Sequence, residues 1–288
     1  MVQVVTPSST REAIDIVRNS DGDAKYLAGG TALVLLVKMR MVNPELLVSL
    51  RGVADLPDWN DIVRTDGELR IGGGVTLTGV AGDRDVRELL PSLAQAAAVV
   101  GNVRIRNCAT VGGAMAEADY ASDPPAALVS LDARVEMTNG ERSRDVPVAD
   151  FITDFFTTVL EPDEIVTAVK VPLRRGDVRA NYLKFSSRSA EDRPCVGVAA
   201  SGAFEGGSTA DLRVVVGAVS SRPQWFPEIT APHLGEPLDA SAVASIADGY
   251  ADAVDPVEDI RGSAWYRRQV VRAQVARSLR RIVGGVGA

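Results

Sequence analysis

Residues 1–57 alternate between short β-branched runs and segments whose apolar residues recur at helical spacing. The runs VQVV, KYLAGGT and ELLVSL are typical of strands, and SSTREAIDIVRN and ALVLLVKMRM lie between them as predicted helices. Ser9 and Glu12 form a capping-box pattern at the start of the first helix. Because parallel strands need crossover connections, this alternation of strands and helices predicts a small βαβαβ sheet.

The pattern changes at Trp59, which places a second subdomain at residues 58–173. It begins with the strand ELRIGGG and a short helix, followed by the small-residue helix LLPSLAQAAAVVGN. The stretch NCATVGGAMAEADYASDPPAA fits neither a helix nor a strand, whereas PAALVSLDA is helical in pattern and RVEMT and EIVTAVKVP are strand-like. Pro172 and the polar LRRGDVRA predict a linker.

Residues 178–288 have the pattern of a third domain. The runs NYLKFSSR, CVGVAASGAF and LRVVVGAVS have hairpin-like spacing and predict antiparallel strands. Helices are expected around residues 240–252 and 263–282. The fold class is therefore α+β, with an α/β portion at the N-terminus and an antiparallel sheet plus helices at the C-terminus.

Composition and charge exclude several classes of protein. The chain has 288 residues, 46% of them apolar, and a formal net charge of −7. Its two cysteines and one histidine cannot build a disulfide framework or, alone, a zinc or iron–sulfur site. No secretory signal and no membrane-spanning run is visible, so we expect a cytoplasmic protein. The acidic balance argues against nucleic acid as a partner.

The last helix is locally basic, with seven arginines in RGSAWYRRQVVRAQVARSLRR. Apolar residues at helical spacing make it amphipathic. Its basic face is compatible with a solvated surface, with docking to a partner subunit, or with nucleic-acid binding.

Two glycine loops carry the candidate chemistry. In LAGGT, a strand leads through Gly29 and Gly30 into a helix, an arrangement that exposes backbone N–H groups to an anion but also occurs in simple turns. It lacks the signatures of a P-loop and of a Rossmann fingerprint. The second loop, ATVGGAMA, offers Thr110 and another glycine pair. Two such loops predict a clamp for the diphosphate of a dinucleotide.

Asp123 follows the second loop, directly before Pro124. One interpretation is a helix N-cap. The other is an acceptor for the hydroxyls of a ribose or ribityl chain. The glycine run at Gly72 has the pattern of a tight exit from a strand.

With these motifs in order, the chain resembles the FAD-binding medium subunit of the molybdenum hydroxylases, the xanthine dehydrogenase and aerobic carbon monoxide dehydrogenase family. The resemblance rests on YLAGGTALVLLVKMRMVNPELLVSL, VRIRNCATVGGAMAEADYASDPPAALVSLDA, LEPDEIVTAVKVP, YLKFSSRSAEDRPCVGVAASGAF and DIRGSAWYRRQVVRAQVARSLRRI. It implies a two-subdomain FAD-binding fold of the vanillyl-alcohol oxidase type, followed by the family's C-terminal domain.

The resemblance also assigns site residues. The first diphosphate segment would comprise Tyr26, Leu27, Ala28, Gly29, Gly30, Thr31, Ala32 and Leu33, and the second Thr110, Val111, Gly112, Gly113 and Ala114. Asp123 would hold the ribityl chain, Val166 would contact the adenine region, and Lys184 would reach the flavin from the C-terminal domain. Ala32 and Ala114 lack the polar side chains common in the family, so backbone contacts are expected there.

What the resemblance implies is an oxidoreductase subunit without catalytic residues for the organic substrate. Electrons would come from a small subunit with two iron–sulfur clusters, reduce a non-covalently held FAD, and leave to an external acceptor. The molybdenum cofactor would belong to a large subunit, in a dimer of heterotrimers. His233 is expected at the surface, and Cys108 is expected to be a packing residue. A free-standing flavin oxidase or reductase and a non-enzymatic dinucleotide-binding module remain alternatives.

Overall fold

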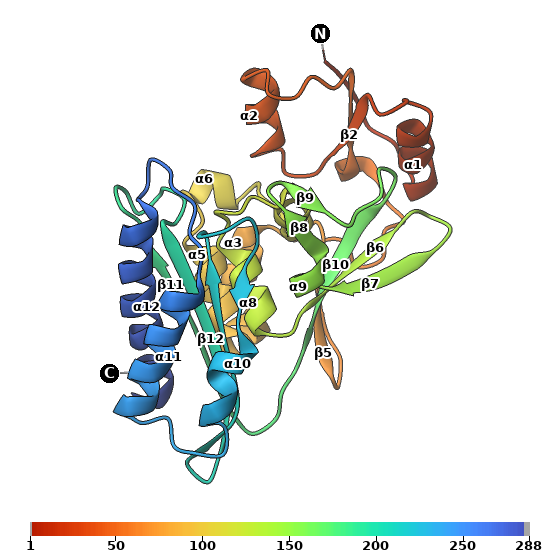
Figure 1. Cartoon of the computed structure of the whole chain (residues 1–288). Coiled ribbons are helices and arrows are strands. Elements are labelled where there is room, and N and C mark those ends of the chain that lie inside the picture. Colours follow the sequence, from red (N-terminus) through yellow and green to blue (C-terminus); the bar gives the residue numbers. More distant parts are fainter. Residues whose placement is uncertain (1, 285–288) are drawn as a thin grey trace.

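The computed structural model describes residues 2–284, and its N-terminal part is a small parallel sheet (Figure 1). The strand order is β1-β3-β2, and both pairings are parallel. The elements are β1 (Gln3–Val5), α1 (Thr10–Arg18), β2 (Ala24–Leu27), α2 (Leu33–Lys38), β3 (Leu46–Ser49) and the 3-10 helix η1 (Leu50–Gly52). The predicted βαβαβ sheet is thus confirmed.

Local sequence sets the ends of both helices in this sheet. The Ser9 hydroxyl accepts from the Glu12 N–H at 3.2 Å, as the capping-box pattern predicts. The Glu12 carboxylate, however, accepts from the N–H of Ser8 at 2.7 Å, one residue earlier than in a capping box. Helix α2 stops at Lys38, short of the predicted end, because Arg40 takes a left-handed backbone with φ of 58°.

The second subdomain is built on a five-stranded antiparallel sheet of order β4-β5-β10-β6-β7. The strands are β4 (Ile62–Arg64), β5 (Glu68–Gly72), β6 (Arg134–Thr138), β7 (Ser143–Pro147) and β10 (Ile165–Pro172). The other elements are α3 (Leu77–Gly82), α4 (Arg84–Leu89), α5 (Pro91–Ala98), α6 (Val103–Arg106), α7 (Val111–Glu117), α8 (Pro124–Ser130), α9 (Val148–Phe151), β8 (Ile152–Asp154) and β9 (Thr157–Thr158). Fully buried Leu69, Met115 and Leu128 join this sheet and its helices in one core.

The structure corrects the prediction for residues 107–127. About half of them are helical, forming α7 and the start of α8. Thr110 caps α7 by accepting from the N–H of Gly113 at 3.1 Å. The small residues are needed because a Cβ on Gly112 would lie 2.9 Å from the Gly73 carbonyl oxygen, so the helix could not approach the neighbouring strand exit so closely. Small residues here indicate a tightly packed helix and not an irregular loop.

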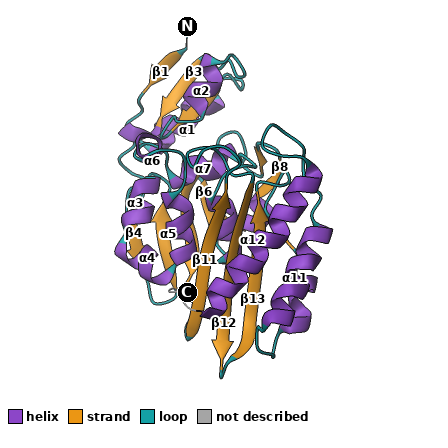
Figure 2. Ribbon diagram, turned by 90° about the vertical axis from the view of Figure 1, so that its left-hand side faces the viewer, coloured by secondary structure: helices purple, strands orange, loops and turns teal. Residues whose placement is uncertain are grey.

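The C-terminal domain is an antiparallel sheet between two helical layers (Figure 2). Its order is β11-β12-β13-β14, and helices α11 and α12 pack on one face. On the other face lie α5 and α8 of the second subdomain. The elements are β11 (Asp177–Phe185), β12 (Val196–Glu205), β13 (Ser208–Gly217), β14 (Gln224–Trp225), α10 (Pro227–Thr230), η2 (Ala231–His233), α11 (Ala240–Ala253) and α12 (Ala264–Gly284).

The three predicted antiparallel strands and the two C-terminal helices are confirmed. The linker prediction is too long, because β11 already begins at Asp177 and pairs there with Phe204. Its polar residues misled the prediction: Asp177 lies at the exposed beginning of β11, where its carboxylate accepts from the Arg179 side chain at 2.8 Å. No helix within residues 2–284 is long and apolar enough to cross a membrane.

Candidate cofactor-binding site

The two glycine loops, far apart in the sequence, touch each other. A Cβ built on Gly29 would lie 2.0 Å from the carbonyl oxygen of Cys108, so only glycine permits this approach. Beside the contact is a cavity of about 220 Å³. It is lined by Ala28, Gly29, Leu50, Arg51, Trp59, Asn60, Gly74, Thr76, Asn107, Cys108 and Thr110. The cavity therefore lies where the first two subdomains meet.

The first loop presents backbone N–H groups that have no partner in the part of the chain that the structure describes. Gly30 takes a left-handed backbone with φ of 73°, which turns the chain between β2 and α2. Within residues 2–284, no oxygen accepts from the N–H groups of residues 29–32. Ala32, at the N-cap of α2, has no side chain that could cap them. A turn of free N–H groups leading into a helix is suited to an anion.

The second loop is different, because its N–H groups already have acceptors. Val111 donates to Val75 and Gly112 donates to Gly73, each at 2.9 Å. The N–H groups of Gly113 and Ala114 are bound to the Thr110 side chain and carbonyl. Of the five residues predicted for this segment, Thr110 alone lines the cavity. The two loops therefore differ: within residues 2–284 the N–H groups of the first have no acceptor, whereas the second begins a packed, capped helix.

Several cavity residues were not anticipated from the sequence. Arg51, in the 3-10 helix η1 that follows β3, is exposed and has no ion pair within residues 2–284. Gly74 packs against Trp59, since its Cβ position is 2.3 Å from the indole Nε1. The run from Gly72 is a strand exit, as predicted, but it also forms a cavity wall. Cys108 is exposed at the cavity, which contradicts its assignment as a packing residue.

Asp123 and Lys184, predicted from separate domains, form a buried pair. The Lys184 Nζ lies 3.3 Å from one Asp123 carboxylate oxygen and donates to the Val99 carbonyl at 2.9 Å. The Tyr182 hydroxyl donates to the other oxygen at 2.7 Å. Asp123 occupies the N-cap position of α8, as one interpretation predicted, but its carboxylate makes these bonds instead of a capping bond. Burial raises the pKa of Asp123 to about 6, although Lys184 opposes the shift.

The remaining predicted residues support the turn or the sheet. The Tyr26 hydroxyl donates to the Asp163 carbonyl at 3.1 Å and so ties β2 to the second subdomain. The Leu27 side chain packs 3.1 Å from the Cβ position of Gly30. Val166 is buried in β10, and its carbonyl faces Gly73 and Gly112. Thr31, Ala32 and Leu33 lie on the path from the turn into α2.

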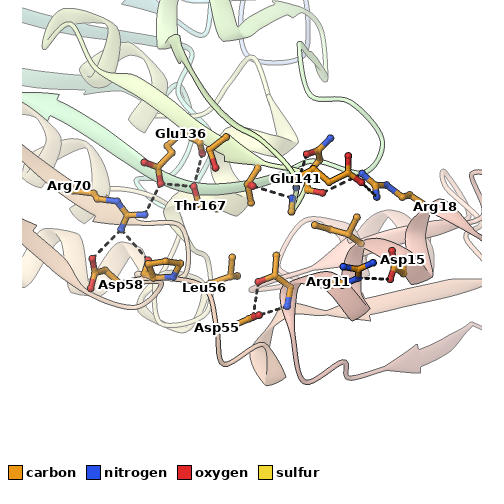
Figure 3. Close-up of a pocket in the computed structure, with 17 residues that line it drawn as sticks. Arg11, Asp15, Arg18, Asp55, Leu56, Asp58, Arg70, Glu136, Glu141 and Thr167 are labelled. Atoms are coloured by element: carbon orange, nitrogen blue, oxygen red, sulfur yellow. Dashed lines mark hydrogen bonds and ion pairs between the residues drawn. The ribbon is translucent and has the colours of Figure 1, made fainter.

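A larger cleft of about 530 Å³ lies elsewhere, between α1 and the five-stranded sheet (Figure 3). None of the predicted site residues lines it. Its charges are largely paired: Arg18 bonds to Glu141 and Asp163, and Arg70 to Glu136 at 2.7 Å. Burial alone would raise the pKa of Glu136, but hydrogen bonds from lysine and arginine neighbours lower it to about 2. The two Arg18 pairs join the first subdomain to the second, whereas the Arg70–Glu136 pair lies within the second.

Other candidate sites are poorly supported among the described residues. Residues 2–284 contain no group of three or more His, Cys, Asp or Glu side chains able to hold a metal ion. His233 is partly exposed in η2, away from the residues that line the cavity. On α12, Arg272 pairs with Asp248 at 2.6 Å and Arg268 with Asp255 at 3.5 Å. These pairs favour a solvated face for that helix.

Comparisons with known proteins cover nearly the whole chain. Residues 1–174 match the family model described as the FAD binding domain in molybdopterin dehydrogenase, and residues 181–282 match the CO dehydrogenase flavoprotein C-terminal domain. The chain is 28% identical to the glyceraldehyde dehydrogenase medium chain of Sulfolobus acidocaldarius, over 96% of this chain and 97% of that one. It is 31% identical to 6-hydroxypseudooxynicotine dehydrogenase complex subunit alpha of Paenarthrobacter nicotinovorans, over 96% and 92%.

Among solved structures, quinoline 2-oxidoreductase from Pseudomonas putida 86 superposes with a TM-score of 0.92 at 27% identity, covering 100% of this chain and 99% of that one. Carbon monoxide dehydrogenase from Hydrogenophaga pseudoflava gives 0.92 at 27% identity, over 97% and 96%. These matches confirm the predicted fold class.

Proposed function

Because the chain belongs to the family of FAD-binding domains of molybdopterin dehydrogenases, we propose that it is the FAD-carrying electron-transfer subunit of a multisubunit molybdenum hydroxylase. In this role it takes electrons from an iron–sulfur subunit and passes them to an external acceptor. Its relatives are medium chains or subunits of dehydrogenases, which supports a role as an oxidoreductase component. The organic substrate would be oxidised on a different subunit.

The observation that carries this proposal is the geometry of the first glycine loop, residues 29–32. Its approach to the Cys108 carbonyl leaves no room for a Cβ, and the N–H groups of residues 29–32 have no acceptor within residues 2–284. A diphosphate supplies the oxygens that these donors lack, and Arg51 places a positive charge at the same cavity. The residues present therefore fit a dinucleotide such as FAD, with its diphosphate against the first loop.

The residues of the chain would bind and orient the cofactor. FAD, when bound, supplies the two-electron redox chemistry, and the chain holds its diphosphate at Gly29–Ala32 and Thr110. We assign Asp123 to the ribityl hydroxyls, Val166 to the adenine side and Lys184 to electrostatic tuning of the flavin. Lys184 is suited to that task because it is almost fully buried and fixed by both Asp123 and the Val99 carbonyl.

Attachment of FAD would be non-covalent. Covalent attachment needs a nucleophilic side chain such as His or Cys. His233 lies outside the cavity, and Cys108 lines its diphosphate side. Denaturation of the purified chain by acid should therefore release all yellow colour into the supernatant, and a yellow pellet would refute this assignment.

The visible spectrum of the purified chain tests the proposal. A yellow chain with flavin absorbance supports it, and a colourless chain that does not bind added FAD would leave only a non-enzymatic module. The second measurement is turnover: a chain that oxidises a substrate with oxygen on its own would be a free-standing flavin enzyme. We expect no such turnover, and reduction only through an iron–sulfur partner.

The proposed assembly contains a small iron–sulfur subunit and a large molybdopterin-binding subunit, arranged as a dimer of heterotrimers in the cytoplasm. It would involve no nucleic acid. Sedimentation of the native complex and assay of its iron and molybdenum content would test this composition.

A further inference from the structure

Two residues of β11, Tyr182 and Lys184, reach across the boundary between the C-terminal domain and the second subdomain. Alternate residues of a strand point to the same face of its sheet, and this sheet packs against α5 and α8 (Figure 1). Both side chains end at Asp123, at the N-cap position of α8. The Tyr182 hydroxyl donates to one carboxylate oxygen at 2.7 Å, and the Lys184 Nζ lies 3.3 Å from the other. Within residues 2–284, the C-terminal domain therefore supplies both side chains that bond to Asp123.

The Asp123 carboxylate makes no bond to its own helix. An N-cap side chain ordinarily accepts from the N–H of the second or third helical residue. Pro124 and Pro125 have no N–H, and Asp123 makes no capping bond. An ionised carboxylate offers about four acceptor positions, so about two remain after the bonds from Tyr182 and Lys184. The Asp123 side chain is only 4% exposed, so a ligand hydroxyl has to meet the carboxylate in the one orientation that its neighbours set.

The Tyr182 side chain is held in one place. It is buried, and its backbone N–H donates to the Gln95 side chain at 2.8 Å. Gly197 of β12 is a diagonal neighbour of Tyr182, and a Cβ there would lie 2.4 Å from the Tyr182 hydroxyl oxygen. Glycine at this position therefore leaves room for the hydroxyl beside Asp123. Burial raises the pKa of Tyr182 above its usual range, so the hydroxyl keeps its proton and acts as the donor.

We propose that Tyr182 is a positioning residue of the cofactor site, whose hydroxyl holds the Asp123 carboxylate in the orientation that accepts from a ribityl hydroxyl of FAD. This role rests on the proposed function, in which Asp123 binds the ribityl chain. Lys184 does not set the orientation by itself, because its ammonium group rotates freely and is shared with the Val99 carbonyl at 2.9 Å. The hydroxyl of Tyr182, in contrast, sits on a rigid and buried ring. The C-terminal domain thereby contributes to cofactor affinity through a residue that acts by way of Asp123.

The test is titration of the full-length apo chain with FAD over a range of pH. Tyr182→Phe removes the hydroxyl and keeps the ring. Gly197→Ala keeps the hydroxyl but displaces it, and its backbone is not left-handed, so alanine is otherwise allowed there. Tyr250→Phe is the matched control, because it makes the same change at a buried tyrosine whose hydroxyl donates to the Val214 carbonyl in the core of the C-terminal domain. Circular dichroism of each variant reports whether the fold is retained.

We expect Tyr182→Phe and Gly197→Ala each to weaken FAD binding about tenfold, as the loss of one hydrogen bond predicts, and Tyr250→Phe to bind like the wild type. In an Asp123→Ala background the effect of Tyr182→Phe should shrink to about twofold or less, because the hydroxyl then has no carboxylate to hold. Burial and the charge of Asp119 raise the pKa of Asp123, whereas Lys184 and Tyr182 lower it. Removing the Tyr182 bond should therefore move the acid midpoint of FAD binding to higher pH.

Three results would overturn the positioning role and leave the proposed function intact. The first is a Tyr182→Phe chain with the affinity and the acid midpoint of the wild type. The second is an undiminished effect of Tyr182→Phe in the Asp123→Ala background, because Tyr182 would then act without Asp123. The third is an equal loss of affinity in Tyr250→Phe, which would mean that the hydroxyl only stabilises the fold. A wild-type chain that does not bind FAD would instead refute the proposed function, and this role with it.

Discussion

The contact between Gly29 and Cys108 is the feature whose perturbation tests the cofactor site most directly. In Gly29→Ala the new Cβ would lie 2.0 Å from a backbone carbonyl oxygen, whereas ordinary contacts begin at 3.4 Å. No side-chain rotation relieves this clash, so the two loops must separate by about 1.4 Å. The donor–acceptor distances from the N–H groups of the first loop to a diphosphate would then be too long for hydrogen bonds.

The size of the effect follows from the bonds that are lost. A hydrogen bond to a charged group contributes about 1.5–3 kcal/mol, so losing two weakens FAD binding by about 3–6 kcal/mol, or roughly a hundredfold to ten-thousandfold. The assay is titration of the apo chain with FAD, followed by flavin and tryptophan fluorescence. Circular dichroism of the same samples would show that the fold is retained.

Gly82→Ala is the control, because its Cβ meets nothing within 4 Å and its backbone is not left-handed. We expect this variant to bind FAD like the wild type. If Gly29→Ala kept wild-type affinity together with the native fold, the inference that the diphosphate lies against the first loop would be refuted.

Three further perturbations test other parts of the site. Arg51→Gln should weaken FAD binding several-fold at low salt and less at high salt, because an exposed charge is screened; equal losses at both would argue against a charge effect. Lys184→Ala should retain FAD but make its potential more negative in spectroelectrochemistry, and an unchanged potential would contradict the tuning role. Burial raises the pKa of Asp123 in the folded state to about 6, above the ordinary value of 3.8, so between these two pH values the folded state holds a proton that the unfolded state has lost. The unfolding free energy should therefore fall by up to about 3 kcal/mol between about pH 4 and pH 6, and Asp123→Asn should remove this dependence in urea unfolding.

The elements were largely predictable because their signals are local. Apolar spacing and glycine turns identified the parallel sheet, the antiparallel C-terminal strands and the two long C-terminal helices. The errors have local causes too. The small residues of α7 indicated a loop, although small size is what lets Gly112 pack against Gly73. The polar residues at Asp177 indicated a linker, although they form the exposed beginning of a strand that is buried farther along.

The candidate site was only partly predictable. The first glycine loop could be recognised because Gly29 and Gly30 stand between a strand-like run and a helical run in the sequence. The hydrogen-bond partners and cavity neighbours of each polar group could not be predicted from the sequence. The sequence does not show that the N–H groups from Val111 to Ala114 are occupied by neighbours, or that Arg51 and Trp59 line the same cavity as Gly29.

The sequence by itself determined that this chain has two glycine loops, an acid before a proline, and a strand carrying a lysine in another domain. The tertiary structure alone decided how these features combine. It set Gly29 against Cys108, left the first loop's N–H groups without an acceptor among residues 2–284, and buried Lys184 beside Asp123. The physical reason is that steric and capping preferences act between near neighbours, whereas the satisfaction of a donor or a charge depends on atoms that only packing brings within reach.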